Sequence, residues 1–148
     1  MTIRKATLED MPQLLAMGEQ FAQYAPYDVE YSAASTEQFL IGLWNMGGVT
    51  LVSEIDGRIA GVICGAISPV WYAPSTRIAG ELAWWVDPNH RGGRHAIGLV
   101  KAFEQWAKDN GASFVSLCDM RINGDYPAGP LFERMGYHTA ERTHTKEI

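Results

Sequence analysis

The sequence contains little cysteine, no long apolar run and no excess of basic residues. Its two cysteines, Cys64 and Cys118, stand in apolar stretches without a CxxC pair, which favours reduced thiols in a cytoplasmic protein over a disulfide framework. No stretch approaches the ~18–20 consecutive apolar residues of a membrane span. Residues 1–5 also lack the apolar core of a secretory signal. We therefore expect neither membrane insertion nor export.

The charge balance is acidic. Twelve Lys and Arg residues against 17 Asp and Glu residues give a net charge of −5. This balance argues against general nucleic-acid binding, which usually needs a basic footprint, and it is compatible with a cationic or amine substrate. The four histidines do not form a metal-ligand set, so no metal is expected; they are His90, His95, His138 and His144.

The composition is that of a globular protein. Hydrophobic residues make up 47% and charged residues 20% of the 148 positions, which is enough for one core and one domain, residues 1–148. Apolar spacing predicts strands at residues 3–6, 49–55, 59–67, 78–86, 113–117 and 137–146. It predicts helices at residues 7–24, 35–46, 96–107 and 127–135, and a loop at 69–75. This order indicates an α+β fold, a one-layer sheet with helices on its faces.

The segment from Val86 to Ala96 is the strongest candidate for chemistry. It joins an expected strand to the clearest amphipathic helix and is rich in glycine and cations. A helix N-terminus offers unpaired N–H groups, glycines admit a close approach of the backbone, and Arg91 and Arg94 add formal charge. The segment suits a phosphate or pyrophosphate, although an ordinary glycine-containing turn has the same composition.

This segment resembles the acyl-CoA-binding motif of the GNAT-type N-acetyltransferase superfamily, Val-x-Pro-x-x-Arg/Gln-x-x-Gly-x-Gly/Ala followed by an amphipathic helix. The positions that carry the resemblance are Val86, Pro88, Arg91, Gly92 and Ala96. Residues 128–137 are similar to a second family block, Ala-x-x-Leu-Tyr-x-Lys/Arg-x-Gly-Phe/Tyr, and residues 3–15 resemble the family's first strand and helix. The resemblance covers nearly the whole chain in the right order.

The resemblance implies a fold and an activity. The fold is a single GNAT-like domain, a central, mostly antiparallel twisted sheet of about six to seven strands flanked by about four helices. The activity is transfer of an acetyl group from acetyl-CoA by direct attack of an amine on the thioester. The acceptor is then a small-molecule or protein amine, and a homodimer is expected because many relatives dimerise.

The resemblance also implies where acetyl-CoA binds. The cofactor lies between the strand that ends at Val86 and the strand that begins near Ser113, with backbone groups of Trp85 and Val86 on the pantetheine arm. The pyrophosphate lies on the backbone amides of the following loop and helix start, Arg91, Gly92, Gly93, Arg94, His95 and Ala96. His95 is a candidate for a further donor to phosphate.

Two positions depart from the family pattern. Arg94 stands where the family has glycine, so its side chain either points outward or becomes a phosphate ligand. Phe132 stands where many relatives have a tyrosine proposed as the acid for the leaving thiolate, and phenylalanine has no proton to give. These departures keep an alternative open, a catalytically silent acyl-CoA-binding or partner-binding module on the same fold.

Glu81 is the best candidate for the general base that deprotonates the amine. It lies in the apolar strand 78–86 beside Trp84 and Trp85, where burial would raise its pKa toward neutrality. Strict alternation puts Glu81 on the face of Trp85, and a bulge would reverse this. The alternative is a solvated carboxylate or one paired with Arg77.

Asp119 and Tyr126 complete the catalytic candidates. Asp119 follows the strand 113–117 and is a second possible base, acting through water; Tyr126 is a candidate acid, with packing as its alternative. On the acceptor side, aromatic residues and carboxylates would suit a cationic amine, or would simply pack; they are Tyr24, Tyr27, Asp28, Glu30, Tyr31, Trp71 and Tyr72.

Overall fold

The structure is a computed structural model that describes residues 1–148, and it forms two compact units, Met1–Cys118 and Asp119–Ile148. The helices are α1 (Met11–Ala22), α2 (Ala33–Asn45), α3 (Arg94–Asp109) and α4 (Gly129–Arg134). The strands are β1 (Thr2–Lys5), β2 (Val49–Ile55), β3 (Arg58–Val70), β4 (Ala73–Val86) and β5 (Phe114–Ser116). Short 3-10 turns, η1 (Leu8–Asp10) and η2 (Pro88–His90), precede α1 and α3.

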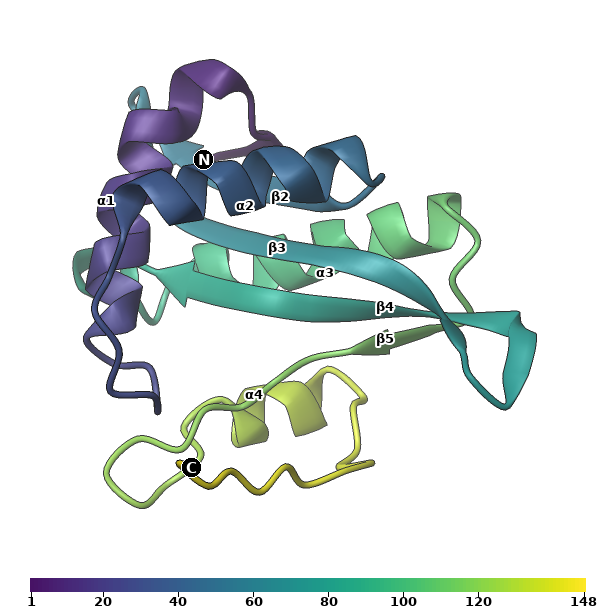
Figure 1. Ribbon diagram of the computed structural model, residues 1–148. Helices are drawn as coiled ribbons and strands as arrows, with labels where there is room; N and C mark the ends of the chain where they lie inside the picture. Colours follow the sequence, from purple (N-terminus) through teal and green to yellow (C-terminus); the bar gives the residue numbers. More distant parts are fainter. The chain divides into compact units, whose positions relative to one another are not determined.

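The first unit holds one five-stranded sheet in the order β1-β2-β3-β4-β5 (Figure 1). Its first four strands pair antiparallel, and β5 adds to β4 in parallel. The β2–β3 turn is Asp56-Gly57, both with positive φ, as expected for a two-residue hairpin turn. The mostly antiparallel α+β sheet predicted from the sequence is confirmed.

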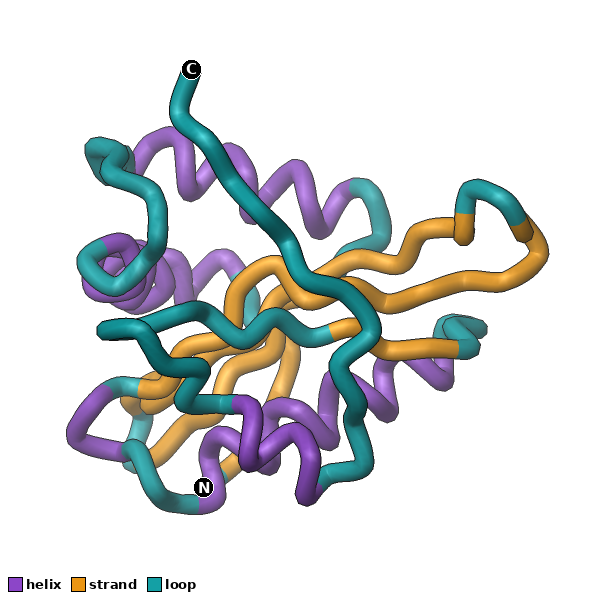
Figure 2. The backbone as a smooth tube through the Cα atoms, turned by 90° about the horizontal axis from the view of Figure 1, so that it is seen from below, coloured by secondary structure: helices purple, strands orange, loops and turns teal.

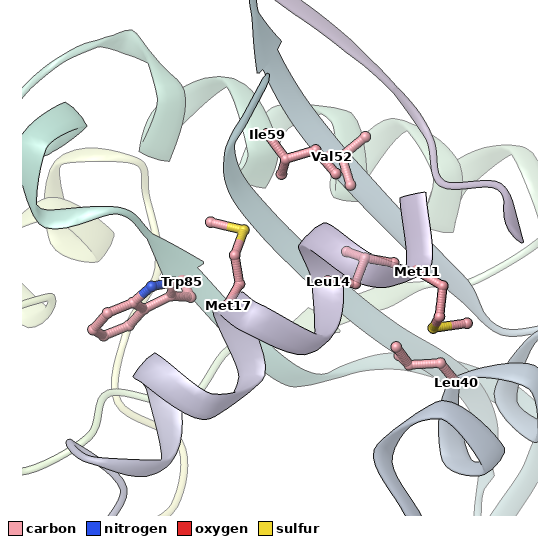
Figure 3. Packing of buried hydrophobic residues seen from close by; sticks show 7 residues of the cluster. All are labelled: Met11, Leu14, Met17, Leu40, Val52, Ile59 and Trp85. Carbon is pink, nitrogen blue, oxygen red and sulfur yellow. The ribbon is translucent and has the colours of Figure 1, made fainter. Parts of the chain in front are cut away.

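Helices cover both faces of this sheet. On one face, a cluster of buried side chains from α1, α2 and the sheet forms the core that Figure 3 shows: Met11, Leu14, Met17, Leu40, Val52, Ile59 and Trp85. On the other face lies α3, whose Leu99 and Phe103 are fully buried. The positions where a side chain would meet these two residues, Gly61 and Gly65, are glycines on β3. The sheet is therefore fixed between two apolar layers, and the part of β4 beyond its pairing with β5 carries the candidate site.

A charge cluster ties the first strand to the first helix and to β2. The Arg4 guanidinium donates to both oxygens of Asp10, at 2.7 and 2.8 Å, and to Glu54 at 2.8 Å. Asp10 also closes a capping box by accepting from the Thr7 backbone N–H at 2.8 Å. The Arg4 hydrogen bonds, more than any other contact, lower the pKa of Asp10 to about 2.

We expect Asp10→Asn to make the protein less stable at pH 7 and to remove part of its acid sensitivity. A depressed carboxyl pKa stabilises the fold above the unfolded pKa of about 4, and this contribution is lost as pH falls toward about 2. Losing a charge-assisted, mostly buried partner costs about 1–3 kcal/mol. Urea denaturation at pH 7, 4 and 2.5 measures the difference, which should shrink as pH falls; a constant difference would contradict this role.

The structure has five strands where the sequence predicted six to seven. The missing element is the last one, expected at residues 137–146; the chain after α4 contains no strand, and Figure 2 draws it as loop. The reason is its composition. From residue 138 onward every residue is exposed, and Ala140 is the single apolar side chain before Ile148. A strand is stabilised by burying one face, and this segment has no apolar face to bury.

The expected loop at residues 69–75 is also wrong. β3 continues to Val70 and β4 begins at Ala73, so this stretch is the end of a long hairpin with a turn at Trp71 and Tyr72. The proline that suggested a loop, Pro69, pairs with Arg77 beside a register shift, and such irregular positions tolerate the missing N–H.

Candidate active site

β4 and β5 stop pairing near the middle of β4. β5 pairs with β4 over three residues only, Ile78 to Gly80 opposite Phe114 to Ser116, and the pairing ends there (Figure 1). On the other side of β4, the register with β3 shifts at the same place: Glu81 lies opposite Gly65 and Ala83 opposite Cys64, so Leu82 is the extra residue of a bulge. The bulge interrupts the alternation that would have put Glu81 on the face of Trp85.

Gly65 makes this bulge possible. A Cβ at Gly65 would lie 2.3 Å from the Gly80 carbonyl oxygen and 2.6 Å from the Phe103 ring. Only glycine lets the β4 backbone and α3 approach β3 this closely. The packing of α3 thus fixes the point where β4 bends.

Glu81 lies at the point where β4 and β5 part, and its carboxylate bridges them. One oxygen accepts the backbone N–H of Cys118 at 2.9 Å. Burial raises the pKa of Glu81 to about 7, and the Cys118 hydrogen bond opposes this rise. The alternative partner, Arg77, donates instead to the Asn110 carbonyl at the end of α3, at 3.0 Å. Glu81 is thus a half-buried carboxyl without a cationic partner, able to exchange a proton near neutral pH.

The glycine-rich loop leads from β4 into an open helix start. Gly92 has φ +76, which glycine adopts without strain, and Gly93 is the residue before α3 with no side chain capping the helix. The first N–H groups of α3 therefore have no side-chain acceptor. Arg94, the first residue of α3, is exposed, and the structure shows it in no hydrogen bond or ion pair.

Arg91 turns back toward the sheet. Its Nε donates to the Val86 carbonyl at 3.0 Å, and its guanidinium carbon lies 4.3 Å from the centre of the Trp85 ring and 5.5 Å from that of Tyr24. Trp85 itself is 5% exposed. In this position Arg91 anchors the loop by stacking on aromatic rings. Arg94 is then the loop cation whose side chain is free to meet an anion.

His95 also points inward. Its ring is buried and Nδ1 lies 2.7 Å from the hydroxyl oxygen of Ser53 on β2. Burial, followed by the nearby cations, lowers the pKa of His95. At the helix start, His95 and Ala96 both offer a backbone N–H. The His95 imidazole lies in the core against Ser53.

Asp119 and Tyr126 belong to the second unit, which is described by itself. Asp119 accepts the Ala128 N–H at 3.1 Å just before α4, and a side chain at Gly129 would lie 3.1 Å from the same carboxylate. Asp119 thus holds the start of α4 in this unit. Tyr126 is half exposed. Their catalytic roles stay predictions.

The aromatic residues expected around the acceptor have different surroundings. Tyr31 donates its hydroxyl to the Leu15 carbonyl at 2.8 Å, and Tyr24 packs on Trp85 with ring centres 5.0 Å apart. Trp71, 87% exposed, contacts the Tyr72 ring at the hairpin tip. Eight residues of extended β4 separate Ala73 from Glu81, a span of about 25 Å. That distance places the Trp71–Tyr72 pair beyond the reach of a small acceptor at Glu81.

The sequence and the fold are both similar to those of acetyltransferases. The model of the acetyltransferase (GNAT) family matches residues 14–137, most of the chain.

The chain belongs to the GNAT acetyltransferase family.

Solved structures of this acetyltransferase fold agree over nearly the full chain. A ribosomal-protein-alanine N-acetyltransferase from Brucella melitensis biovar Abortus 2308 has TM-score 0.78 at 18% identity, covering 100% of both chains. A glucosamine-6-phosphate N-acetyltransferase from Arabidopsis thaliana has TM-score 0.78 at 17% identity, covering 99% of this chain and 97% of its own. A predicted acetyltransferase with acetyl-CoA from Clostridium acetobutylicum has TM-score 0.77 at 17% identity, covering 99% and 95%. Among curated proteins, none matches significantly.

Membership makes the protein an N-acetyltransferase by class, in a family that uses acetyl-CoA. No group of three or more His, Cys, Asp or Glu side chains could hold a metal ion. No helix is long and apolar enough to cross a membrane. A shallow hollow near the end of α3, between Lys108 and Phe114, contains none of the predicted site residues.

Sequence reasoning missed three features of this GNAT site. The Ser53–His95 contact joins residues 42 apart, and nothing in the local pattern of β2 indicates it. The Arg91–Trp85 stack was hidden because Arg91 suggested a phosphate ligand. The third is the position of the bulge opposite Glu81: the sequence left a bulge open, and Gly65, a glycine inside an apolar strand, marks where the backbones approach closely.

Proposed function

We propose that this GNAT protein transfers the acetyl group of acetyl-CoA to a primary amine by direct attack of the amine on the thioester. The observation that carries the proposal is Glu81, a carboxyl with a pKa of about 7 at the point where β4 and β5 part. A base with this pKa is available at neutral pH and still strong enough to accept a proton from an ammonium through water. Family membership supplies the donor.

Glu81 has the role of general base in this proposal. Acetyl-CoA supplies a thioester carbon that the amine attacks, with CoA as the leaving group. The carboxylate of Glu81 takes the proton that the ammonium must lose, and the Cys118 N–H keeps the carboxylate in place. Asp119 is proposed as a second proton acceptor through water, and Tyr126 as a proton donor to the leaving group. A thiol of pKa ~8.5 leaves readily, so a donor is not essential.

The other end of the donor is proposed to lie on the glycine-rich loop. The backbone N–H groups from Gly92 to Ala96 and the free side chain of Arg94 would hold the pyrophosphate, while the Arg91 N–H donates to the Pro88 carbonyl. Beyond Gly80, the β5 side of β4 has no paired strand, so backbone groups toward Trp85 and Val86 remain for the amides of pantetheine. Arg91 contributes by holding the loop against Val86 and Trp85.

The acceptor is proposed to be a small-molecule or protein amine. The related structures bear names with different acceptors, a ribosomal-protein alanine and glucosamine 6-phosphate, so the fold does not select among them. The acidic net charge of −5 favours a cationic amine. A homodimer in the cytoplasm is part of the same proposal.

Acetyl-CoA binding is the first test. By titration calorimetry we expect micromolar binding of acetyl-CoA, weaker binding of ATP, and an Arg94→Ala variant with Kd raised about 5-fold, the effect of one exposed charge-assisted contact. Arg58→Ala removes the same charge from the exposed start of β3 and should leave Kd unchanged.

The outcomes separate the candidates. An unchanged Kd in Arg94→Ala would remove Arg94 from the site. Binding of acetyl-CoA without turnover on any amine would favour the silent module, which Phe132 supports because it is buried and has no hydroxyl. No binding by the wild type would overturn the proposed function.

A further inference from the structure

We propose that Ser53 and His95 are positioning residues that fix the glycine-rich loop and the first turn of α3 for acetyl-CoA. This inference rests on the proposed function, because it concerns the same binding loop. Neither residue would touch the substrate through its side chain. Their contact joins the middle of the sheet to the helix start that receives the anion.

The contact is buried and specific. Ser53 is 0% exposed on β2 and lies next to the register shift between Ser53 and Glu54. His95 is the second residue of α3 and 8% exposed, and its Nδ1 lies 2.7 Å from the Ser53 oxygen. A short hydrogen bond between two buried polar groups is costly to break, because each partner would lose its only compensation for burial.

The loop needs anchors on both sides. Gly92 and Gly93 separate Arg91 from α3, and neither contributes side-chain packing. Arg91 fixes the loop on the β4 side through Val86 and Trp85. On the helix side, the Ser53–His95 contact is the side-chain hydrogen bond that ties the first turn of α3 to the sheet. Without it, two glycines would leave the helix start free to sample other positions.

The surroundings of His95 keep its ring neutral. The titratable groups that act on it are all cations or potential cations: His90 from η2, with ring centres 5.5 Å apart, the Met1 ammonium and Arg94. Ser53, from β2, carries no charge. Protonation would place a further cation in this buried position, which lowers the pKa of His95, so the contact loses stability progressively as pH falls below the ordinary histidine pKa of about 6.5. Anchoring is therefore strongest at neutral pH and weaker in acid.

The experiment compares Ser53→Ala, His95→Leu and His95→Asn with the wild type. Asparagine places its amide nitrogen near the position of Nδ1 and does not titrate, so it preserves the hydrogen bond to Ser53. At pH 7.5, we expect amide hydrogens of residues 92–98 to exchange at least about 10-fold faster in Ser53→Ala and His95→Leu, and within about 2-fold of wild type in His95→Asn. These variants report on the anchor without any substrate.

The second readout is acetyl-CoA. We expect the KM for acetyl-CoA to rise about 5–10-fold in Ser53→Ala while kcat at saturation changes less than about 2-fold, because positioning is recovered once the donor is bound. Between pH 7.5 and 5.5, the Kd of the wild type should rise about 3-fold more than that of His95→Asn. Dividing the change in Kd of the wild type by that of His95→Asn removes the contribution of CoA titration, which is the same for both proteins.

Each result has one meaning. If Ser53→Ala leaves both the amide exchange of residues 92–98 and the KM for acetyl-CoA at their wild-type values, the inference is overturned. This holds even if His95→Leu fails to fold. Faster exchange with unchanged acetyl-CoA KM would also overturn it, because the contact would then serve stability alone. If the wild type binds no acetyl-CoA, the proposed function fails by itself, and the exchange data still decide whether the anchor exists.

Discussion

Glu81→Gln should lower turnover by about 10²–10⁴-fold, the usual contribution of a general base. Glutamine keeps the shape and can still accept the Cys118 N–H, but it cannot take a proton. Acetyl-CoA affinity should stay within about 2-fold of wild type, since the pyrophosphate loop is untouched. Steady-state rates with an identified amine, together with calorimetry, measure both.

The pH dependence gives this prediction its sharpest form. In the wild type, kcat/KM should rise as pH increases through about 7, where the Glu81 carboxylate forms. The variant should lack this rise. If Glu81→Gln keeps the wild-type pH profile, Glu81 is not the base, and Asp119 becomes the leading candidate.

The stability of the same variant is its control. Glu81 is a half-buried carboxyl with a raised pKa, so its ionisation destabilises the folded state once pH exceeds the unfolded pKa. This destabilisation is complete above about pH 7. Glutamine never ionises, so at pH 8 the variant should be no less stable than the wild type. A loss of activity can then not be attributed to unfolding.

Among substitutions that add one methyl group to a glycine of the sheet, Gly65→Ala should destabilise the protein most. The new Cβ would meet the Gly80 carbonyl oxygen at 2.3 Å and the Phe103 ring at 2.6 Å. Neither β4 nor the buried α3 can move away freely, and such overpacking costs about 1–3 kcal/mol, occasionally more. The folded fraction should also have altered activity, because the bulge that carries Glu81 lies opposite Gly65. Urea denaturation measures the first effect.

Gly80→Ala is the matched control. It adds the same methyl group to the neighbouring strand, where a Cβ would meet nothing within 4 Å. Alanine restricts the unfolded chain more than glycine does, so this variant should be neutral or slightly stabilised. If both variants lost the same stability, the effect would come from replacing any glycine in a strand. The close approach of β4 and α3 to Gly65 would then not be its cause.

The parts of the fold that could be predicted are those with a local signal. The helix of Leu99, Phe103 and Trp106 has a clear apolar face, and the turn at Asp56-Gly57 has a characteristic residue pair. Both are present in the structure. The prediction of a strand after α4 was wrong. Thr and His recur between residues 138 and 145, and Thr favours strands, but the segment has no apolar face that a strand could bury.

The sequence identified residues of the candidate site but could not predict which residues contact one another. Glu81 was identified from its apolar strand, yet its partner, the Cys118 N–H, is 37 residues away. Arg91, Arg94 and His95 look equivalent as cations of one loop. In the structure, Arg91 stacks on the Trp85 ring, His95 contacts the Ser53 hydroxyl, and Arg94 has no side-chain partner. Such choices depend on strands distant in sequence.

The stack of Arg91 on Trp85 gives the protein an optical sensor of its own loop. The Trp85 indole is buried, whereas Trp71 at the hairpin tip is exposed, and the sequence has three further tryptophans, Trp44, Trp84 and Trp106. A variant with phenylalanine at the four other positions leaves Trp85 as the only indole that emits. A cation held 4.3 Å from an indole ring perturbs its excited state. Any ligand that draws Arg91 off the ring therefore changes the fluorescence at the moment the loop moves, and stopped-flow mixing can time that motion without an added dye.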